Sequence, residues 1–143
     1  MKDLIFLSVA LPLLGSIISP FTRLAPYIAT GSVFGSFIIS CFLFINLDEP
    51  VVASAFNWIT VAETEIQFSF TLDRLSMVMM LLVTGVGGLI HLYSISYMKG
   101  EPVRYFSYLN LFIFSMLVLV LGSNLPMLFI GWEGVGLCSY ILI

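Results

Sequence analysis

Five long stretches of apolar residues, separated by short polar breaks, constrain the fold of this chain more than any other feature. A helix needs about 20 mostly apolar residues to cross the hydrocarbon core of a membrane. Lipid offers the backbone no hydrogen-bond partner, so spanning segments adopt helices that pair their own amides and carbonyls. We therefore predict an all-α membrane protein with about five transmembrane helices, over residues 4–19, 27–47, 75–97, 105–122 and 125–143.

Composition supports a membrane protein and excludes several other classes. Of the 143 residues, 60% are hydrophobic and 9% are charged, whereas a soluble domain carries about 25% charged residues. We expect one transmembrane region, 1–143, and no separate soluble domain. The five basic residues are scattered, which predicts no nucleic-acid partner. Cys41 and Cys138 lie singly in apolar segments, so neither a metal site nor a redox motif is indicated.

The first apolar run is expected to be a retained membrane anchor. It begins at Leu4 and is followed by Arg23 without a clear small-residue cleavage site. A secretory signal would carry its positive charge ahead of the apolar core. Prolines mark the breaks that follow, because proline and its predecessor resist continuing a helix. Asn124 stands as an N-cap before the last segment, which has Pro126 in its first turn.

The longest break, residues 48–74, is expected to form a short β-hairpin. Residues 67–72 alternate polar and apolar side chains, which is typical of an extended strand at a surface. Val51-Val52 and Trp58-Ile59 are candidate partners for that strand. The aromatic residues of this break suit the interfacial belt of a membrane.

Charge asymmetry predicts the orientation. Three basic residues, Arg23, Lys99 and Arg104, fall near the first and third loops, and two, Lys2 and Arg74, fall on the opposite side. The positive-inside rule then places the first and third loops in the cytoplasm or its equivalent, and the N-terminus outside. The last helix runs inward, and the rise per residue places its single acid roughly 12 Å deep, near the bilayer midplane.

That acid, Glu133, is the leading candidate for function. It stands in an otherwise uncharged segment, 125–143, where a charge costs about 2.5 kcal/mol or more to insert. Such residues usually face a bundle interior or a wet cavity and often lie on an ion or proton path, although a purely structural tie to a neighbouring helix is the alternative. Gly131, Gly134 and Gly136 flank the acid, and they serve either close helix packing or space for water.

Three further motifs carry weaker signals. His91 is a candidate proton relay, because imidazole titrates near neutrality; an interfacial histidine bonded to a carbonyl is the alternative. Asp73-Arg74 opens the third helix, and the structural explanation of an acid at a helix N-terminus is favoured there. Gly31 and Gly35 form a G-x-x-x-G in an apolar helix, which predicts a packing surface for another helix.

Several blocks of this sequence resemble a known family. They are Leu72-Asp73-Arg74-Leu75-Ser76, Val83-Thr84-Gly85-Val86-Gly87, His91 to Met98, Phe106 to Phe112, and Gly131-Trp132-Glu133-Gly134-Val135-Gly136-Leu137-Cys138-Ser139-Tyr140. The chain resembles the N-terminal part of the distal antiporter-like subunit of respiratory complex I, known as the L subunit of NADH–quinone oxidoreductase and as mitochondrial chain 5. The resemblance is weak before about Phe56 and strong from Phe70 onward.

The resemblance implies a role in proton translocation driven by NADH oxidation and quinone reduction in other subunits. The family is helical and built from inverted repeats. Its glutamate in the G-W-E-G-V-G block, here Glu133, pairs with a lysine on a later, broken helix and modulates the pKa of that lysine. The implied partners are neighbouring membrane subunits and the lipid bilayer. NADH, flavin, iron–sulfur clusters and quinone are expected on other subunits, and no cofactor or metal on this chain.

Alternatives remain open at this stage. The chain stops at Ile143, before the lysine helix, so we expect no pumping by these residues alone: they form a fragment, a piece of a split subunit or a truncated product. The large subunit of a multisubunit sodium/proton antiporter is also similar, and a structural, non-pumping membrane protein is a further reading. The bacterial inner membrane is the expected location, with the mitochondrial inner membrane as the alternative.

Overall fold

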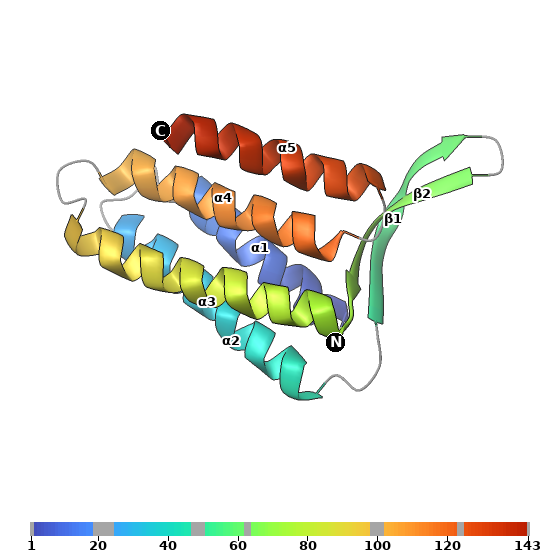
Figure 1. The fold of residues 1–143 in the computed structure, drawn as a ribbon, viewed down its shortest axis with the longest axis horizontal. Helices are drawn as coiled ribbons and strands as arrows, with labels where there is room; N and C mark the ends of the chain where they lie inside the picture. Colours follow the sequence, from blue (N-terminus) through green and yellow to red (C-terminus); the bar gives the residue numbers. More distant parts are fainter. Residues whose placement is uncertain are drawn as a thin grey trace.

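Five helices and one β-hairpin make up the chain (Figure 1). The computed structural model describes residues 2–18, 25–46, 51–61, 64–97, 102–122 and 125–142. The elements are, in order, α1 (Lys2–Ile18), α2 (Ala25–Asn46), β1 (Val51–Val61), β2 (Thr64–Leu72), α3 (Arg74–Tyr97), α4 (Pro102–Leu121) and α5 (Leu125–Leu142). The predicted all-α architecture, with five helices and a hairpin after the second, is confirmed.

Helices that follow one another in the sequence run in opposite directions (Figure 1). α1, α2, α3 and α4 pack against one another as a bundle, while α5 packs mainly against α4 and makes a smaller contact with β2. The N-terminus lies at the end of the bundle from which the hairpin projects, and the C-terminus lies at the other end. α5 is therefore an outer helix of this arrangement.

Two helices begin earlier than the apolar pattern predicts. α2 begins at Ala25 and α4 at Pro102, where helices were expected from Tyr27 and Tyr105. The reason is that a proline in the first turn of a helix forfeits no hydrogen bond, because the first amides have no partner within the helix. The predictions for Arg23, Lys99 and Asn124 fall outside the described residues.

The lengths and exposed surfaces of the helices suit a membrane. Two apolar helical segments, Tyr27–Asn46 and Arg74–Ile95, are long enough to cross a bilayer. Three shorter apolar helices accompany them, over Leu4–Ile18, Tyr105–Leu121 and Leu125–Ile141. Large apolar side chains such as Ile38, Ile45 and Leu89 are exposed on the outside of the bundle, where lipid accommodates them without cost.

The hairpin pairs its strands in antiparallel fashion, from Val51 opposite Leu72 to Val61 opposite Thr64. The predicted strand over 67–72 forms part of β2, and both candidate partner segments lie in β1. The register shifts between Ser54 and Phe56 and between Asn57 and Ile59. Such bulges increase the local twist of a two-stranded ribbon.

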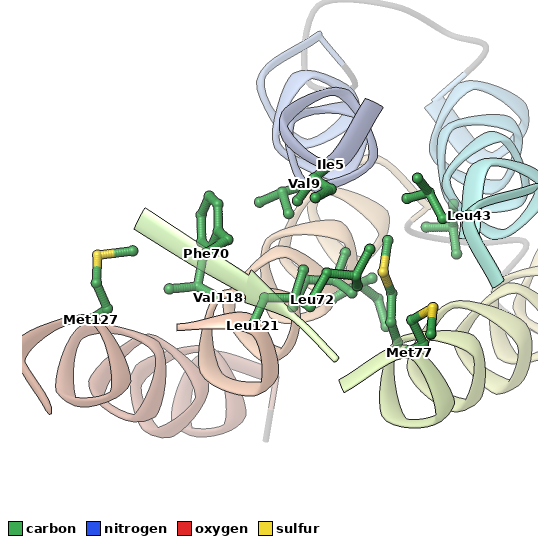
Figure 2. Close-up of a cluster of buried hydrophobic side chains, with 13 residues drawn as sticks. Ile5, Val9, Leu43, Phe70, Leu72, Met77, Val118, Leu121 and Met127 are labelled. Atoms are coloured by element: carbon green, nitrogen blue, oxygen red, sulfur yellow. The ribbon is translucent and has the colours of Figure 1, made fainter. Parts of the chain in front are cut away.

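The base of β2 is built into the hydrophobic core. Phe70 and Leu72 are buried among side chains from all five helices, including Ile5, Leu43, Met77, Leu121 and Met127 (Figure 2). The Phe70 ring meets Phe6 of α1 edge-on, with ring centroids 5.7 Å apart. The hairpin is therefore anchored at its base by the end of the bundle.

Asp73 joins the hairpin to α3 as a helix N-cap. Its carboxylate accepts a hydrogen bond of 2.7 Å from the Ser76 amide, and its carbonyl accepts the first helical bond, from the Met77 amide at 2.9 Å. This geometry is that of an N-cap. The hydrogen bond from Ser76 holds the pKa of the Asp73 carboxyl below its usual value.

Candidate functional site

Glu133 lies on the face of α5 that is turned away from α4. The inner face of α5 is formed by Met127, Gly131, Gly134 and Cys138, which recur at helical spacing. Met127, Gly131 and Cys138 are buried, whereas Glu133 is exposed together with Trp132 and Leu137. Within α1–α5, Glu133 therefore does not face a bundle interior, although it was expected to. The surroundings of its carboxylate depend on what covers this face of α5.

An open groove runs along this outer face. Phe129, Trp132, Glu133, Gly136 and Leu137 line a hollow of about 490 Å³. The carboxylate is the charged group of that lining, and aromatic and aliphatic side chains form the remainder. A carboxylate in such a setting is placed to meet a polar or cationic group supplied by a neighbouring element.

The three glycines around Glu133 divide between the two roles expected of them. A Cβ on Gly131 would lie 2.5 Å from the backbone nitrogen of Leu119, and one on Gly134 would lie 2.5 Å from Ser115 Oγ. These two glycines therefore allow α5 to approach α4 closely. At Gly136 no atom of the described residues lies within 4 Å of the same position, and this glycine lines the groove beside Glu133.

His91 is buried within the bundle. Its Nδ1–H donates to the carbonyl oxygen of Gly87 at 2.7 Å, so the carbonyl bond of the structural alternative is present. Phe106 of α4 lies beside the ring, with centroids 6.0 Å apart. Asn110, one turn further along α4, also interacts with the histidine side chain. Within the described ranges, no atom meets the geometric criterion for a hydrogen bond to His91 Nε2.

The structure does not bring His91 and Glu133 together. His91 points into the α1–α4 bundle from α3, whereas Glu133 points out of it from α5, and α4 packs against both of these helices. The two candidates therefore belong to separate sites. Asn110, which lies beside His91, was missed at the level of sequence; its signal was a single amide side chain in the apolar segment 105–122.

The remaining sequence motifs have structural roles. Arg74 is exposed at the start of α3, directly after the cap. Gly35 approaches Leu11 of α1, with 3.4 Å between that side chain and a Cβ placed on the glycine, but Gly31 is exposed and meets none of the described atoms within 4 Å. The predicted packing surface is therefore formed by Gly35 and the buried serines beside it, without Gly31. Within the described ranges, no group of three His, Cys, Asp or Glu side chains is placed to hold a metal ion.

Comparisons with known proteins identify the family. Residues 58–106 match the family of the N-terminus of NADH–ubiquinone oxidoreductase (complex I) chain 5. The chain is 40% identical over 153 aligned residues to NADH-quinone oxidoreductase subunit L of Escherichia coli (strain K12), an alignment that covers 99% of this chain and 25% of that protein. The chain belongs to the subunit L and chain 5 family.

Other members and neighbours agree with this family. NADH-ubiquinone oxidoreductase chain 5 of Cryphonectria parasitica is 40% identical, over 94% of this chain and 22% of that protein. A chain in the structure of the Mrp complex from Dietzia sp. DQ12-45-1b superposes with a TM-score of 0.78 at 26% identity, over 96% of this chain and 15% of that chain. The chain thus spans about a quarter of the length of the subunit L it matches.

Proposed function

We propose that this chain forms the N-terminal part of a membrane subunit of a proton-pumping NADH–quinone oxidoreductase. It contributes to proton translocation that is coupled to NADH oxidation and quinone reduction in other subunits, as a non-redox part of the translocase. NADH, flavin, iron–sulfur clusters and quinone are bound by those subunits. The chain provides one transmembrane region, without a soluble domain, and its partners are neighbouring membrane subunits.

The observation that carries this proposal is the exposed carboxylate of Glu133 in an apolar helix, α5, whose 18 residues contain no other charged side chain. An intramembrane acid is costly unless it meets a cation or water, and α1–α5 leave this one facing an open groove. We infer that a lysine from outside these 143 residues lies against the groove. Glu133 then stabilises the charged form of that lysine, and separating or joining the pair changes the affinity of the lysine for its proton.

The test is Glu133→Gln in the full-length subunit within its assembled complex. We expect the number of protons moved per NADH oxidised, measured in inverted membrane vesicles, to fall. Glu133→Asp, which keeps the carboxylate, should retain more pumping than Glu133→Gln. Ser139→Ala is the matched control, because Ser139 is an exposed polar residue of the same helix. An unchanged ratio in Glu133→Gln would remove the proposed role.

A second candidate function is that of the large subunit of a multisubunit sodium/proton antiporter. The likeness to the Mrp complex chain, with a TM-score of 0.78, favours it. Two experiments distinguish these functions. In membranes that carry the protein, a quinone-site blocker should inhibit NADH oxidation if the main proposal holds. Sodium sensitivity of a strain that lacks the gene would support the antiporter instead.

A structural, non-pumping role makes a different prediction for Glu133. If the helices only dock on a neighbouring subunit, Glu133→Ala should alter the yield of assembled complex and leave the proton stoichiometry of the surviving complex unchanged.

His91 is proposed as a proton relay on a path separate from Glu133, which its buried, titratable ring supports. Replacement by Phe should then lower pumping without lowering the amount of assembled complex.

The proposed membrane is the bacterial inner membrane, with the hairpin end of the bundle outside. Bacterial and fungal relatives are equally identical to this chain, at 40%, and the alternative is the mitochondrial inner membrane. A cysteine placed in the hairpin of an otherwise cysteine-free variant should react with an impermeant maleimide in intact cells. Reaction only after the membrane is opened would reverse the orientation.

A further inference from the structure

A second groove lies between α2 and α3, on the side of the bundle away from α5 (Figure 1). Its volume is about 530 Å³, within the range of pockets that bind small molecules. α2 contributes Phe34, Phe37 and Phe44, and α3 contributes six residues between Val78 and Leu89. Among the described residues that line it, none has a polar side chain, so the groove fits an apolar ligand.

Two glycines of α3 allow the aromatic side chains of α2 to line this groove. A Cβ on Gly85 would lie 3.0 Å from the Phe37 ring, and one on Gly88 would lie 3.1 Å from the Phe34 ring. The two rings therefore rest against the backbone of α3, because these positions carry no side chain. Larger residues there would displace the rings and change the shape of the groove.

The groove has the length of one membrane leaflet. Between Val78 and Leu89, α3 rises roughly 16 Å, about half of the 30 Å hydrocarbon core of a bilayer. Both helices that form the groove are long enough to cross that core. Val78 lies one turn after the start of α3, and Phe44 lies two residues before the end of α2. The groove therefore begins near the hairpin end of the bundle and extends toward the middle of the membrane.

A positive charge lies at the hairpin end of this groove. Arg74, the first residue of α3, is exposed. It shares a helix face with Val78 and Leu82, because residues four positions apart lie above one another. An arginine near the end of a spanning helix reaches the level of the lipid headgroups. The adjacent acid, Asp73, accepts a hydrogen bond from the Ser76 amide and caps the helix.

We propose that this groove binds an acyl chain of an anionic phospholipid whose phosphate is held by Arg74. The apolar lining and the length of one leaflet fit the acyl chain, and a guanidinium binds phosphate through two parallel hydrogen bonds. Bulk lipid is as apolar as the lining, so the preference for an anionic lipid comes from Arg74. This site does not depend on the proposed pumping role of Glu133.

The test uses two photoactivatable lipids, phosphatidylglycerol and phosphatidylcholine, that carry the same diazirine-labelled acyl chain. Each is reconstituted with the assembled complex that contains the full-length subunit, and labelled peptides are identified by mass spectrometry. We expect the phosphatidylglycerol probe to label the groove peptides of α2 and α3 more strongly than the phosphatidylcholine probe. Arg74→Gln should lower its labelling roughly fivefold, the effect expected for one basic residue near an anionic headgroup. Arg74→Lys, which keeps the charge, should retain most of the preference.

A variant that fills the groove tests the acyl-chain part of the site. Leu82→Trp should lower labelling by both probes, because Leu82 lines the groove. Ile38→Trp is the matched control, since Ile38 is an exposed residue of α2 outside the lining, and it should leave labelling unchanged.

Three results would overturn the proposal. They are equal labelling of the wild type by the two probes, unchanged labelling in Leu82→Trp, and a cryo-EM map of the complex in which a protein helix fills the groove. If a variant does not assemble, the comparison of the two probes on the wild type and the map decide.

Discussion

The hydroxyl of Ser36 in α2 donates a hydrogen bond of 2.6 Å to the carbonyl oxygen of Ser8 in α1. That carbonyl lacks its usual helical donor, because the residue four positions later is Pro12, which has no N–H. In a membrane, backbone groups released by an interior proline are paired by neighbouring helices. Ser36 therefore makes the proline of α1 tolerable and joins α1 to α2 at the same point.

Ser36→Ala should destabilise the chain in detergent micelles by about 1–2 kcal/mol, because a buried carbonyl loses its donor. In a Pro12→Ala background the restored amide takes over that role, and the cost of Ser36→Ala should fall to roughly 0.5 kcal/mol or less. Unfolding titrations of the four variants measure this coupling. Ser40→Ala is the control, since the Ser40 hydroxyl donates within its own helix, to the Ser36 carbonyl. Equal costs in the two backgrounds would contradict the account.

Gly131→Ala should separate α5 from α4. The new methyl group would lie 2.5 Å from the backbone nitrogen of Leu119, which cannot move aside as a side chain can. We expect a loss of about 1–3 kcal/mol in the free energy of unfolding, measured by the same titration. Gly136→Ala is the matched control, because that position is open and alanine favours the helix by up to about 1 kcal/mol. Similar losses for both variants would show that helix approach is not the cause.

Asp73→Ala should shorten or loosen the start of α3. Removing an N-cap acceptor costs about 0.5–2 kcal/mol, here the bond from the Ser76 amide. The helicity of the chain and its free energy of unfolding measure the effect. Leu75→Ala is the control, because the Leu75 side chain is 73% exposed and its removal leaves the backbone amides of the cap in place.

The same residue predicts a dependence of stability on pH. The pKa of Asp73 is lowered in the folded chain, so the unfolded chain binds this proton more readily. The stabilisation is fully present above the unfolded pKa of about 3.9 and is lost as the pH falls through the lower folded value. Asp73→Asn keeps an acceptor without a charge and should remove this pH dependence. A wild-type slope that survives in Asp73→Asn must come from other groups.

Phe70→Ala should release the base of the hairpin from the bundle. Phe70 is 2% exposed and packs on Phe6 of α1, so its loss should cost about 3–5 kcal/mol. Faster proteolysis within the hairpin, compared with the wild type, is the expected readout. Thr71→Ala, at a partly exposed neighbouring position, should leave cleavage unchanged. Equal protection in Phe70→Ala would mean that strand pairing alone holds the hairpin.

Much of the architecture follows from the sequence because its physical basis is local. Apolar runs of membrane length become helices wherever the environment is lipid. The alternation over 67–72 predicted a strand, and Asp73 before a helical run predicted an acid at a helix N-terminus. α2 and α4 begin earlier than predicted, at Ala25 and Pro102, because a proline in the first turn of a helix removes no backbone hydrogen bond. The prolines that predicted a break between two helices therefore lie inside the helices.

The contents of the two candidate sites could be predicted only in part. Glu133 and His91 are visible as isolated titratable residues in apolar segments. Whether each faces inward depends on the rotation of its helix, and these apolar helices carry little polar patterning to set it. Asn110 could not be paired with His91 from sequence, because the two residues meet only where α3 packs on α4.

The sequence by itself determined the membrane class, the number of helices, the hairpin and the family, because each depends on local composition or on motifs read along the chain. The tertiary structure alone decided that Glu133 faces away from α4, that Ser36 satisfies the carbonyl left open by Pro12, and that His91 meets Asn110. These relationships join residues from different helices or depend on how a helix is rotated in the bundle. They are set by side-chain packing across the helix contacts, which no single segment encodes.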